Sequence, residues 1–129
     1  MTRIQVHSDR REQMLDVTDQ VSAAVRQAAV DEGICLVATP HTTCAVTVNE
    51  GWDPHVQADA LQHLRQLIPQ HAGFSHQEGN SDSHLKAMAL GNSASLPVSG
   101  GELQLGCWQA VFLCEFDGPR PREVWVVVS

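Results

Sequence analysis

The sequence predicts an α+β fold with two main helices. Three observations lead to this prediction: short β-rich runs open the chain, two segments place apolar residues at helical spacing, and further β-rich runs close it. A length of 129 residues suits one core, so we expect a single domain over residues 1–129. With 43% hydrophobic and 18% charged residues, the chain can bury a core and is unlike a disordered segment.

The β-rich runs are short and are bounded by glycine, proline or polar residues. Ser99-Gly100-Gly101 suits a tight hairpin, and Gly118-Pro119 suits the last turn. We expect strands at Arg3–Val6, Leu15–Val17, Ile34–Ala38, Cys44–Val48, Ser95–Val98, Leu103–Leu105, Cys107–Phe116 and Val124–Val128.

The first helix is predicted directly after the second of these strands. Thr18 or Asp19 can cap it, and Gly33 can supply a left-handed stop. Its predicted apolar face consists of Val21, Ala24, Val25, Ala28 and Ala29.

The second helix is predicted where Asp53 and Pro54 combine an N-cap with a first-turn proline, and Pro69 closes it. Gln70–Asp82 has no apolar periodicity and is predicted to be a long loop, a kind of segment that is usually functional or mobile. A helical turn is expected at Leu85–Leu90. The predicted buried stripe of the second helix consists of Val56, Ala60, Leu64, Leu67 and Ile68.

Charge and composition narrow the possible partners. The chain has 8 Lys+Arg against 15 Asp+Glu, a formal charge of −7, which opposes attraction to nucleic acids and anionic lipids. No apolar run approaches the roughly 20 residues that span a bilayer, so we expect no membrane association and a cytoplasmic location. Cys35, Cys44, Cys107 and Cys114 lack metal-site spacing and are expected to be reduced, buried thiols.

The polar segment His76–Lys86 is the first candidate for chemistry. Its functional groups occur at every second residue, so in extended chain they would share a side. Such a mixture can bind a divalent metal, transfer protons or hold a phosphate, and the alternative is a solvated loop. The residues are His76, Glu78, Asn80, Asp82, His84 and Lys86.

Two strand ends offer further polar groups. His41 follows Pro40 at the end of a β run, although a lone histidine there is more often structural. The next strand ends in Asn49 and Glu50, close to Asp53, which has a competing role as N-cap.

Other polar positions have equally ordinary explanations. His55, Asp59 and His63 share one face of the second helix, but a solvated face explains them better than a metal site, because no HExxH frame is present. Trp108 and Gln109 can wall a pocket, with core packing of Trp108 as the alternative. No phosphate-binding loop motif is present, so an anion site would be built from scattered groups such as Lys86, Arg120, Arg122, Ser81 and Ser83.

Four segments of the chain resemble, in their order and spacing, the YjbQ-like family, which is also labelled secondary thiamine-phosphate synthase enzyme. They are HTTCAVTVNEGWDP, HQEGNSDSHLKAMALG, LQLGCWQAVFLCEFDGPR and VWVVV. The resemblance runs from about Ile4 to Val128. It implies a compact α+β sandwich with a mixed β-sheet, a homotrimer, and a polar, metal-capable pocket at or near subunit boundaries. Cys44 and Cys107 depart from it, since small or hydroxyl residues are common at these two positions.

Carried over residue by residue, the resemblance places a polar signature on this chain. It reinforces the segment His76–Lys86 and adds Asp53 and Asp59. We expect catalytic roles for Asn49, Glu50, Glu78, Asp82 and Lys86, substrate binding by Thr42, Asn80, Trp108, Gln109 and Glu115, and binding of a divalent metal, zinc or magnesium, by His41, His76 and His84.

Three functions remain open from the sequence. The first, implied by the resemblance, joins hydroxymethylpyrimidine diphosphate to thiazole phosphate and releases diphosphate, although 8 basic residues provide few groups to hold two phosphorylated substrates. The second is a metal-dependent hydrolase or lyase with Glu78 or Glu50 as base. The third is a non-enzymatic trimeric module that binds a metabolite.

Overall fold

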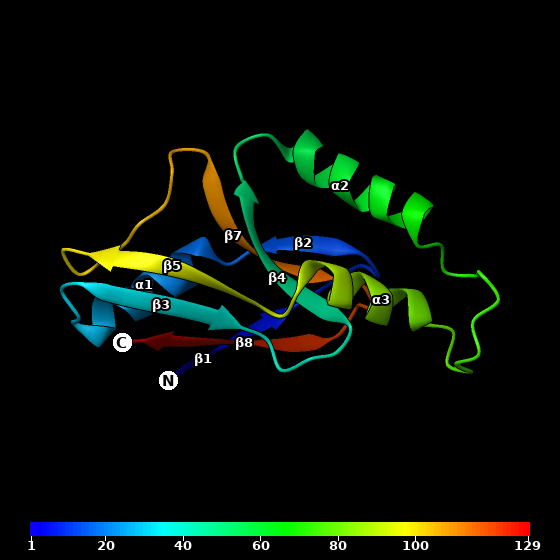
Figure 1. Ribbon diagram of the computed structural model, residues 1–129, viewed down its shortest axis with the longest axis horizontal. Coiled ribbons are helices and arrows are strands. Elements are labelled where there is room, and N and C mark those ends of the chain that lie inside the picture. Colours follow the sequence, from blue (N-terminus) through cyan, green and yellow to red (C-terminus); the bar gives the residue numbers. More distant parts are fainter.

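The computed structural model describes residues 1–129 and contains eight strands and three helices. Figure 1 shows them with both termini at the same end of the molecule. In chain order the elements are β1 (Thr2–His7), β2 (Gln13–Asp16), α1 (Thr18–Ala28), β3 (Gly33–Ala38), β4 (Cys44–Glu50), α2 (Pro54–Leu67), α3 (Ser81–Leu90), β5 (Ser93–Ser99), β6 (Glu102–Leu103), β7 (Gln109–Glu115) and β8 (Pro121–Val128).

The strands form two sheets, and every strand pair is antiparallel. One sheet has the order β1-β8-β3-β5-β6 and the other the order β2-β7-β4. The α+β class is confirmed, but the expected mixed sheet is wrong. Parallel neighbours need a crossover that returns the chain in the same direction, and none of the paired strands here is joined in that way.

The three-stranded sheet is the central layer of the molecule. β7 alternates its side chains, so Val111 and Leu113 join the main core while Phe112 and Cys114 face the opposite side. The main core lies between this sheet, the five-stranded sheet and the apolar face of α1. On the opposite side, α3 and the inner face of α2 contact the smaller cluster. This alternation explains why β7 reads as a continuous apolar run.

The ends of α1 differ from the sequence prediction. The left-handed residue after the helix is Ala29, with φ of 54°, whereas Gly33 is the first residue of β3. The side chain that accepts from the first turn is Asp16, from the Thr18 amide over 3.0 Å, whereas the Thr18 hydroxyl accepts from the Val111 amide of β7 over 2.9 Å. For α2 the prediction is confirmed, because Asp53 Oδ1 accepts a hydrogen bond from the His55 amide over 2.9 Å.

The middle of the chain departs most from the prediction. None of the residues of α2 is buried, so the expected buried stripe is wrong, and in Figure 1 the helix stands at the edge of the molecule. α3 begins at Ser81, inside the predicted loop, directly after Asn80. In a helix, neighbours lie three and four residues apart, so Asp82 and Lys86 share a face of α3, whereas His84 lies on a different face, unlike the common side predicted for extended chain.

Glycines serve at two turns. Gly100 and Gly101, with φ of 60° and 75°, form the predicted two-residue hairpin between β5 and β6. A Cβ at Gly118 would lie 2.6 Å from Ser8 Oγ, so only glycine lets the β7–β8 turn approach the end of β1 so closely.

Two sequence expectations concern thiols and membranes. All four cysteines are free; Cys35, Cys44 and Cys114 are buried, but Cys107 is exposed because it lies in the loop before β7 rather than inside the strand. Of the helices, none is both long and apolar enough to cross a membrane.

Adjacent valines on β8 offer a test of the sheet packing. Val126 is 2% exposed and faces the core, whereas Val127 is 38% exposed on the outer face. We expect Val126→Ala to lower the free energy of unfolding by about 2 kcal/mol, through lost burial and a residual cavity. The matched control Val127→Ala should cost less than about 1 kcal/mol. Guanidinium denaturation measures both, and equal losses would contradict the packing.

Candidate functional site

A polar pocket of about 330 Å³ opens where three segments meet: the loop after β3, the start of α3, and the turn between β7 and β8. Apart from Pro40, every side chain that lines it is polar or charged. Its lining comprises Pro40, His41, Thr42, Thr43, Glu78, Asn80, His84, Asp117, Arg120 and Arg122. We call this the polar pocket.

In the loop after β3, side chains take over the hydrogen bonds to β8 that main-chain groups of β3 make within the sheet. The last β3–β8 pair is Ala38 with Trp125. Beyond it, the Thr39 hydroxyl donates to the Glu123 carbonyl over 3.1 Å, and the Glu123 amide donates to His41 Nε2 over 2.9 Å. The imidazole of His41 is therefore held in one orientation by β8.

A buried ion pair lies beneath the polar pocket. Arg122, at the start of β8, donates through Nε to Glu115 Oε1 over 2.8 Å and through Nη2 to Glu115 Oε2. Arg122 also donates to the Thr43 hydroxyl over 2.7 Å, and the Ser8 hydroxyl donates to Glu115 Oε1 over 2.7 Å. The Asp117 amide donates to the other carboxylate oxygen over 3.0 Å. One carboxylate thus joins four segments of both sheets.

Pairing sets the charge state of Glu115, whereas burial is the first influence on His41. Burial alone would raise the pKa of Glu115, but hydrogen bonds from Arg122, Ser8 and the Asp117 amide outweigh burial and lower it. Burial, followed by the charge of Arg122, lowers the pKa of His41. Glu115 is therefore ionised and His41 neutral at neutral pH.

Two further histidines lie near the mouth of the polar pocket. His84, on α3, also lines an adjoining pocket of about 460 Å³ together with His41 and Thr42. The ring of His76 packs edge-on against that of His84, with centroids 5.6 Å apart, and His76 Nε2 lies 3.7 Å from the Glu78 carboxylate. Expected metal and acid–base residues thus meet at the start of α3.

These histidines do not form a metal site as they stand. No group of three or more histidine, cysteine, aspartate or glutamate side chains is placed to hold an ion. His41 Nε2 is engaged by the Glu123 amide, so that nitrogen cannot be a ligand unless the bond breaks. The expected ligand set of His41, His76 and His84 does not fit a zinc or magnesium ion in this conformation.

Asp82 and Lys86 lie in a separate buried network, away from the polar pocket. Arg11 donates two hydrogen bonds to the Asp82 carboxylate, over 3.1 and 2.9 Å, and Lys86 Nζ donates to Asp82 Oδ2 over 2.7 Å. Lys86 also lies 3.5 Å from Glu12, which in turn pairs with Arg65 of α2 over 3.1 Å. With Lys86 only 1% exposed, its ammonium group cannot meet a substrate phosphate, and both residues have a structural role here.

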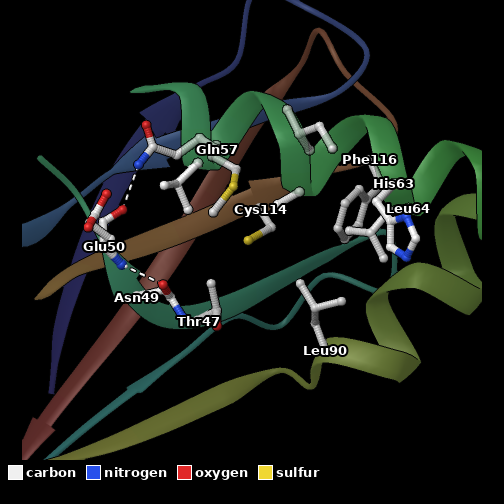
Figure 2. Close-up of a pocket in the computed structure, with 13 residues that line it drawn as sticks. Thr47, Asn49, Glu50, Gln57, His63, Leu64, Leu90, Cys114 and Phe116 are labelled. Carbon is white, nitrogen blue, oxygen red and sulfur yellow. Dashed lines mark hydrogen bonds between the residues drawn. The ribbon is translucent and has the colours of Figure 1, made fainter. Parts of the chain in front are cut away.

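Asn49 and Glu50 lie at the mouth of an apolar groove of about 350 Å³ beneath α2 (Figure 2). Figure 2 shows Asn49 Oδ1 accepting from the Glu50 amide, over 2.7 Å, and Gln57 of α2 donating to the Glu50 carbonyl, over 2.6 Å. The floor and walls of the groove are formed by side chains such as Leu64, Leu90, Cys114 and Phe116.

Trp108 and Gln109 lie near this second location. Trp108 is 57% exposed and packs edge-on against Trp52, at 6.0 Å between centroids, so core packing of Trp108 is wrong. Gln109 Oε1 accepts from the Gly106 amide over 2.8 Å. Because β4 runs from Cys44 to Glu50, this corner lies roughly 20 Å from the polar pocket along the strand. One small substrate cannot reach both locations in one chain.

The polar face of α2 is solvated, as the sequence indicates. The His55 side chain is 89% exposed. Asp59 and His63 line a shallow hollow with two glutamines of the same helix, and His63 also lines one end of the apolar groove beneath α2. No feature of this face gathers groups for a chemical role.

Sequence reasoning missed several residues that matter. Asp117 accepts from Asn80 over 2.9 Å and from Arg120 over 3.1 Å, and so joins two walls of the polar pocket. Arg11 and Glu12 complete the network around Asp82. The only available signal was the position of Asp117 beside a predicted turn; the other two residues stand in a polar stretch with no pattern.

Comparisons of the sequence and of the structure with known proteins point to the same family. Residues 2–129 match the family model described as UPF0047 protein YjbQ-like. A UPF0047 protein of Methanocaldococcus jannaschii is 40% identical over 98% of this chain and 91% of its own length, and one of Archaeoglobus fulgidus is 44% identical over 91% of each. A crystal structure of an uncharacterized conserved protein from Clostridium acetobutylicum superposes with a TM-score of 0.98 at 37% identity, over 100% of both chains. A conserved hypothetical protein of Thermus thermophilus superposes with a TM-score of 0.92 at 43% identity, over 100% of both chains.

The buried Glu115 carboxylate makes a prediction about acid stability. Its folded pKa lies below the ordinary value of about 4.3, so its contribution is complete above that pH and is lost as the pH falls further. Glu115→Gln should lower the free energy of unfolding at pH 7 by about 3 kcal/mol, because Arg122 stays buried without its partner. It should also flatten the stability profile between pH 5 and pH 3.

The control for this prediction is Glu102→Gln. Glu102 is exposed and pairs only with Arg26, over 3.4 Å. It should change the free energy of unfolding little at any pH. Urea denaturation across the pH range measures both variants. If the free energy of unfolding of Glu115→Gln fell with pH as steeply as that of the wild type, the role given to this carboxylate would be contradicted.

Proposed function

Because this chain belongs to the YjbQ-like UPF0047 family, we propose that its polar pocket binds a small phosphorylated substrate and forms thiamine phosphate with release of diphosphate. The reaction follows from the family resemblance, and the pocket from the structure. In this reaction the bond between the pyrimidine methylene carbon and the diphosphate oxygen breaks. The thiazole nitrogen then forms a carbon–nitrogen bond to the same methylene.

The observation that carries the proposal is a concentration of hydrogen-bond donors on an acidic protein. Arg120 is half exposed and uses one of its nitrogens to pair with Asp117, which leaves other N–H groups for a ligand. The Thr42 hydroxyl and the imidazoles of His41 and His84 line the same pocket. Guanidinium, hydroxyl and imidazole donors are suited to phosphoryl oxygens.

Each donor has a defined role in this proposal. Arg120 holds charge on the leaving diphosphate, where a preorganised cation is most effective. His84 donates a hydrogen bond, or a proton, to the departing oxygen. Asp117 positions Arg120 and Asn80 across the pocket. Glu78 is an acceptor at the rim, placed for a cationic or amino group of a substrate.

Replacement of Arg120 tests the site. Arg120→Ala should weaken binding of inorganic pyrophosphate at least tenfold, since a charge-assisted hydrogen bond contributes about 1.5–3 kcal/mol. The same variant should lower formation of thiamine phosphate from hydroxymethylpyrimidine diphosphate and thiazole phosphate. Calorimetry measures binding, and chromatography of the product measures turnover.

The matched control is Arg26→Ala. Arg26 is a half-exposed arginine of α1 with a single ion-pair partner, like Arg120. It should leave pyrophosphate affinity unchanged. Equal effects of the two variants would contradict the site. Pyrophosphate binding without turnover by the wild type would contradict the transferase and leave a metabolite-binding module.

We also propose that the protein is a homotrimer and that α2 packs against a neighbouring copy. The proposal rests on the unburied helix, on the apolar groove beneath it and on the exposed rings of Trp52 and Trp108. Exposed aromatic rings beside an apolar groove are typical of protein interfaces. A groove and a different apolar surface on the next copy would form a head-to-tail contact, which gives a ring when the rotation between copies closes. The number of three copies comes from the family resemblance.

Solution mass tests the trimer. Light scattering after gel filtration should give three times the 14.1 kDa of one chain. Leu67 is 63% exposed, so Leu67→Glu should fold normally and yet reduce the mass, because a charge would enter the interface. The control Gln66→Glu adds the same charge one residue away and should remain a trimer. A wild-type mass of one chain would contradict the proposal.

A further inference from the structure

The hydrogen bond from the Glu123 amide fixes which nitrogen of His41 carries the proton. A ring nitrogen that accepts a hydrogen bond presents a lone pair, so the proton of the neutral ring is on Nδ1. Protonation of Nε2 would place two donors face to face and leave the Glu123 amide without an acceptor. The tautomer is therefore set by β8, before any ligand arrives.

Surrounding elements hold the ring in place. Pro40 restricts the backbone directly before His41. The His41 amide donates to the Thr39 hydroxyl oxygen over 3.4 Å, and that hydroxyl donates to the Glu123 carbonyl. Glu123 lies past the point where β3 ends, so its amide and carbonyl find their hydrogen-bond partners in the side chains of the loop that follows β3. Rotation of the ring would break this arrangement.

The charges around His41 favour the neutral ring. Burial lowers its pKa, Arg122 lowers it further, and Arg120 acts in the same direction. Glu123 and Glu115 act in the opposite direction, and the negative charge of Glu115 is balanced by the adjacent Arg122. From α3 and the segment before it, His84 and Glu78 face the same pocket, and Asp117 faces it from the β7–β8 turn.

We infer that His41 is a neutral donor whose Nδ1–H binds a phosphoryl oxygen of the substrate in the polar pocket. The inference rests on the proposed function for the identity of the ligand. Within the protein, Nδ1 makes none of the hydrogen bonds of His41; Nε2 and the main-chain amide make them. Nδ1 is the remaining group of the ring, and His41 lines both adjoining pockets.

This assignment divides the work between the two histidines. His41 cannot be a general base through Nε2, because that lone pair already accepts the Glu123 amide. Proton transfer therefore falls to His84, which the protein does not hold by any hydrogen bond through its ring nitrogens. A donor fixed in this way selects a ligand oxygen with a lone pair and disfavours a cation at the same position.

The tautomer is measured directly in the full-length protein. Protein labelled with nitrogen-15 is studied at pH 7 by long-range proton–nitrogen correlation of the imidazole rings, with His41→Asn to assign the signals. We expect His41 to carry one proton, on Nδ1, in the absence of ligand. Inorganic pyrophosphate should then shift the Nδ1–H resonance. Protonation on Nε2, or on both nitrogens, overturns the inference.

Two variants add a functional measurement. His41→Ala removes the donor and should weaken pyrophosphate binding about tenfold, the loss of one hydrogen bond to a charged group. His41→Asn places an amide N–H near the position of Nδ1 and should recover most of the affinity. Equal losses in both overturn the donor role.

Failure of the inference is distinguishable from failure of the proposed function. Nε2 protonation together with normal pyrophosphate binding overturns only the role of His41. Pyrophosphate that binds without moving the Nδ1–H resonance does the same. Absence of pyrophosphate binding by the wild type overturns both the donor role and the proposed function.

Discussion

The ion pair between Glu115 and Arg122 is the interaction on which the rest of the site depends. Glu115 ends β7 of one sheet and Arg122 begins β8 of the other, so the pair joins the two layers at the corner where the polar pocket opens. The same carboxylate accepts from Ser8 and from the Asp117 amide, and Arg122 holds Thr43. A buried pair adds little net stability over an apolar pair, but removal of one partner leaves an uncompensated charge. Its main contribution is therefore geometry: it fixes the β7–β8 turn and the loop of His41.

The expected site residues separate into three places in the structure. His41, Thr42, Glu78, Asn80 and His84 gather in the polar pocket, with His76 beside His84. Asp82, Lys86 and Glu115 are buried in ion-pair networks that support it. Asn49, Glu50, Trp108 and Gln109 lie at or near the far end of β4, by the apolar groove. A polar signature in sequence thus mixes residues that line the polar pocket with residues that hold the scaffold.

Signals from residues close in sequence predicted most helices and strands. The features that they did not predict depend on contacts between residues far apart in the chain. Alternating and helical patterns, the Asp53 cap and the Gly100-Gly101 hairpin depend on neighbouring residues, and the structure confirms them. The start of α3 could not be predicted because its hydrophobic face is small and its polar residues are satisfied by Arg11 and by the Phe116 carbonyl, both distant in sequence. The apolar stripe of α2 predicted burial that one chain does not provide. Pairings such as Glu115 with Arg122 leave no periodic trace, since they join residues at the two ends of a turn.

We propose that a fixed imidazole and a guanidinium with free N–H groups make the polar pocket a site for phosphoryl groups. The most direct measurement is a crystal structure of the protein grown with millimolar inorganic pyrophosphate. We expect pyrophosphate in the polar pocket, with its oxygens within hydrogen-bond distance of His41 Nδ1 and of the Arg120 guanidinium. Pyrophosphate bound only at the Asn49–Glu50 corner, or a His41 ring turned away from the Glu123 amide, would contradict it.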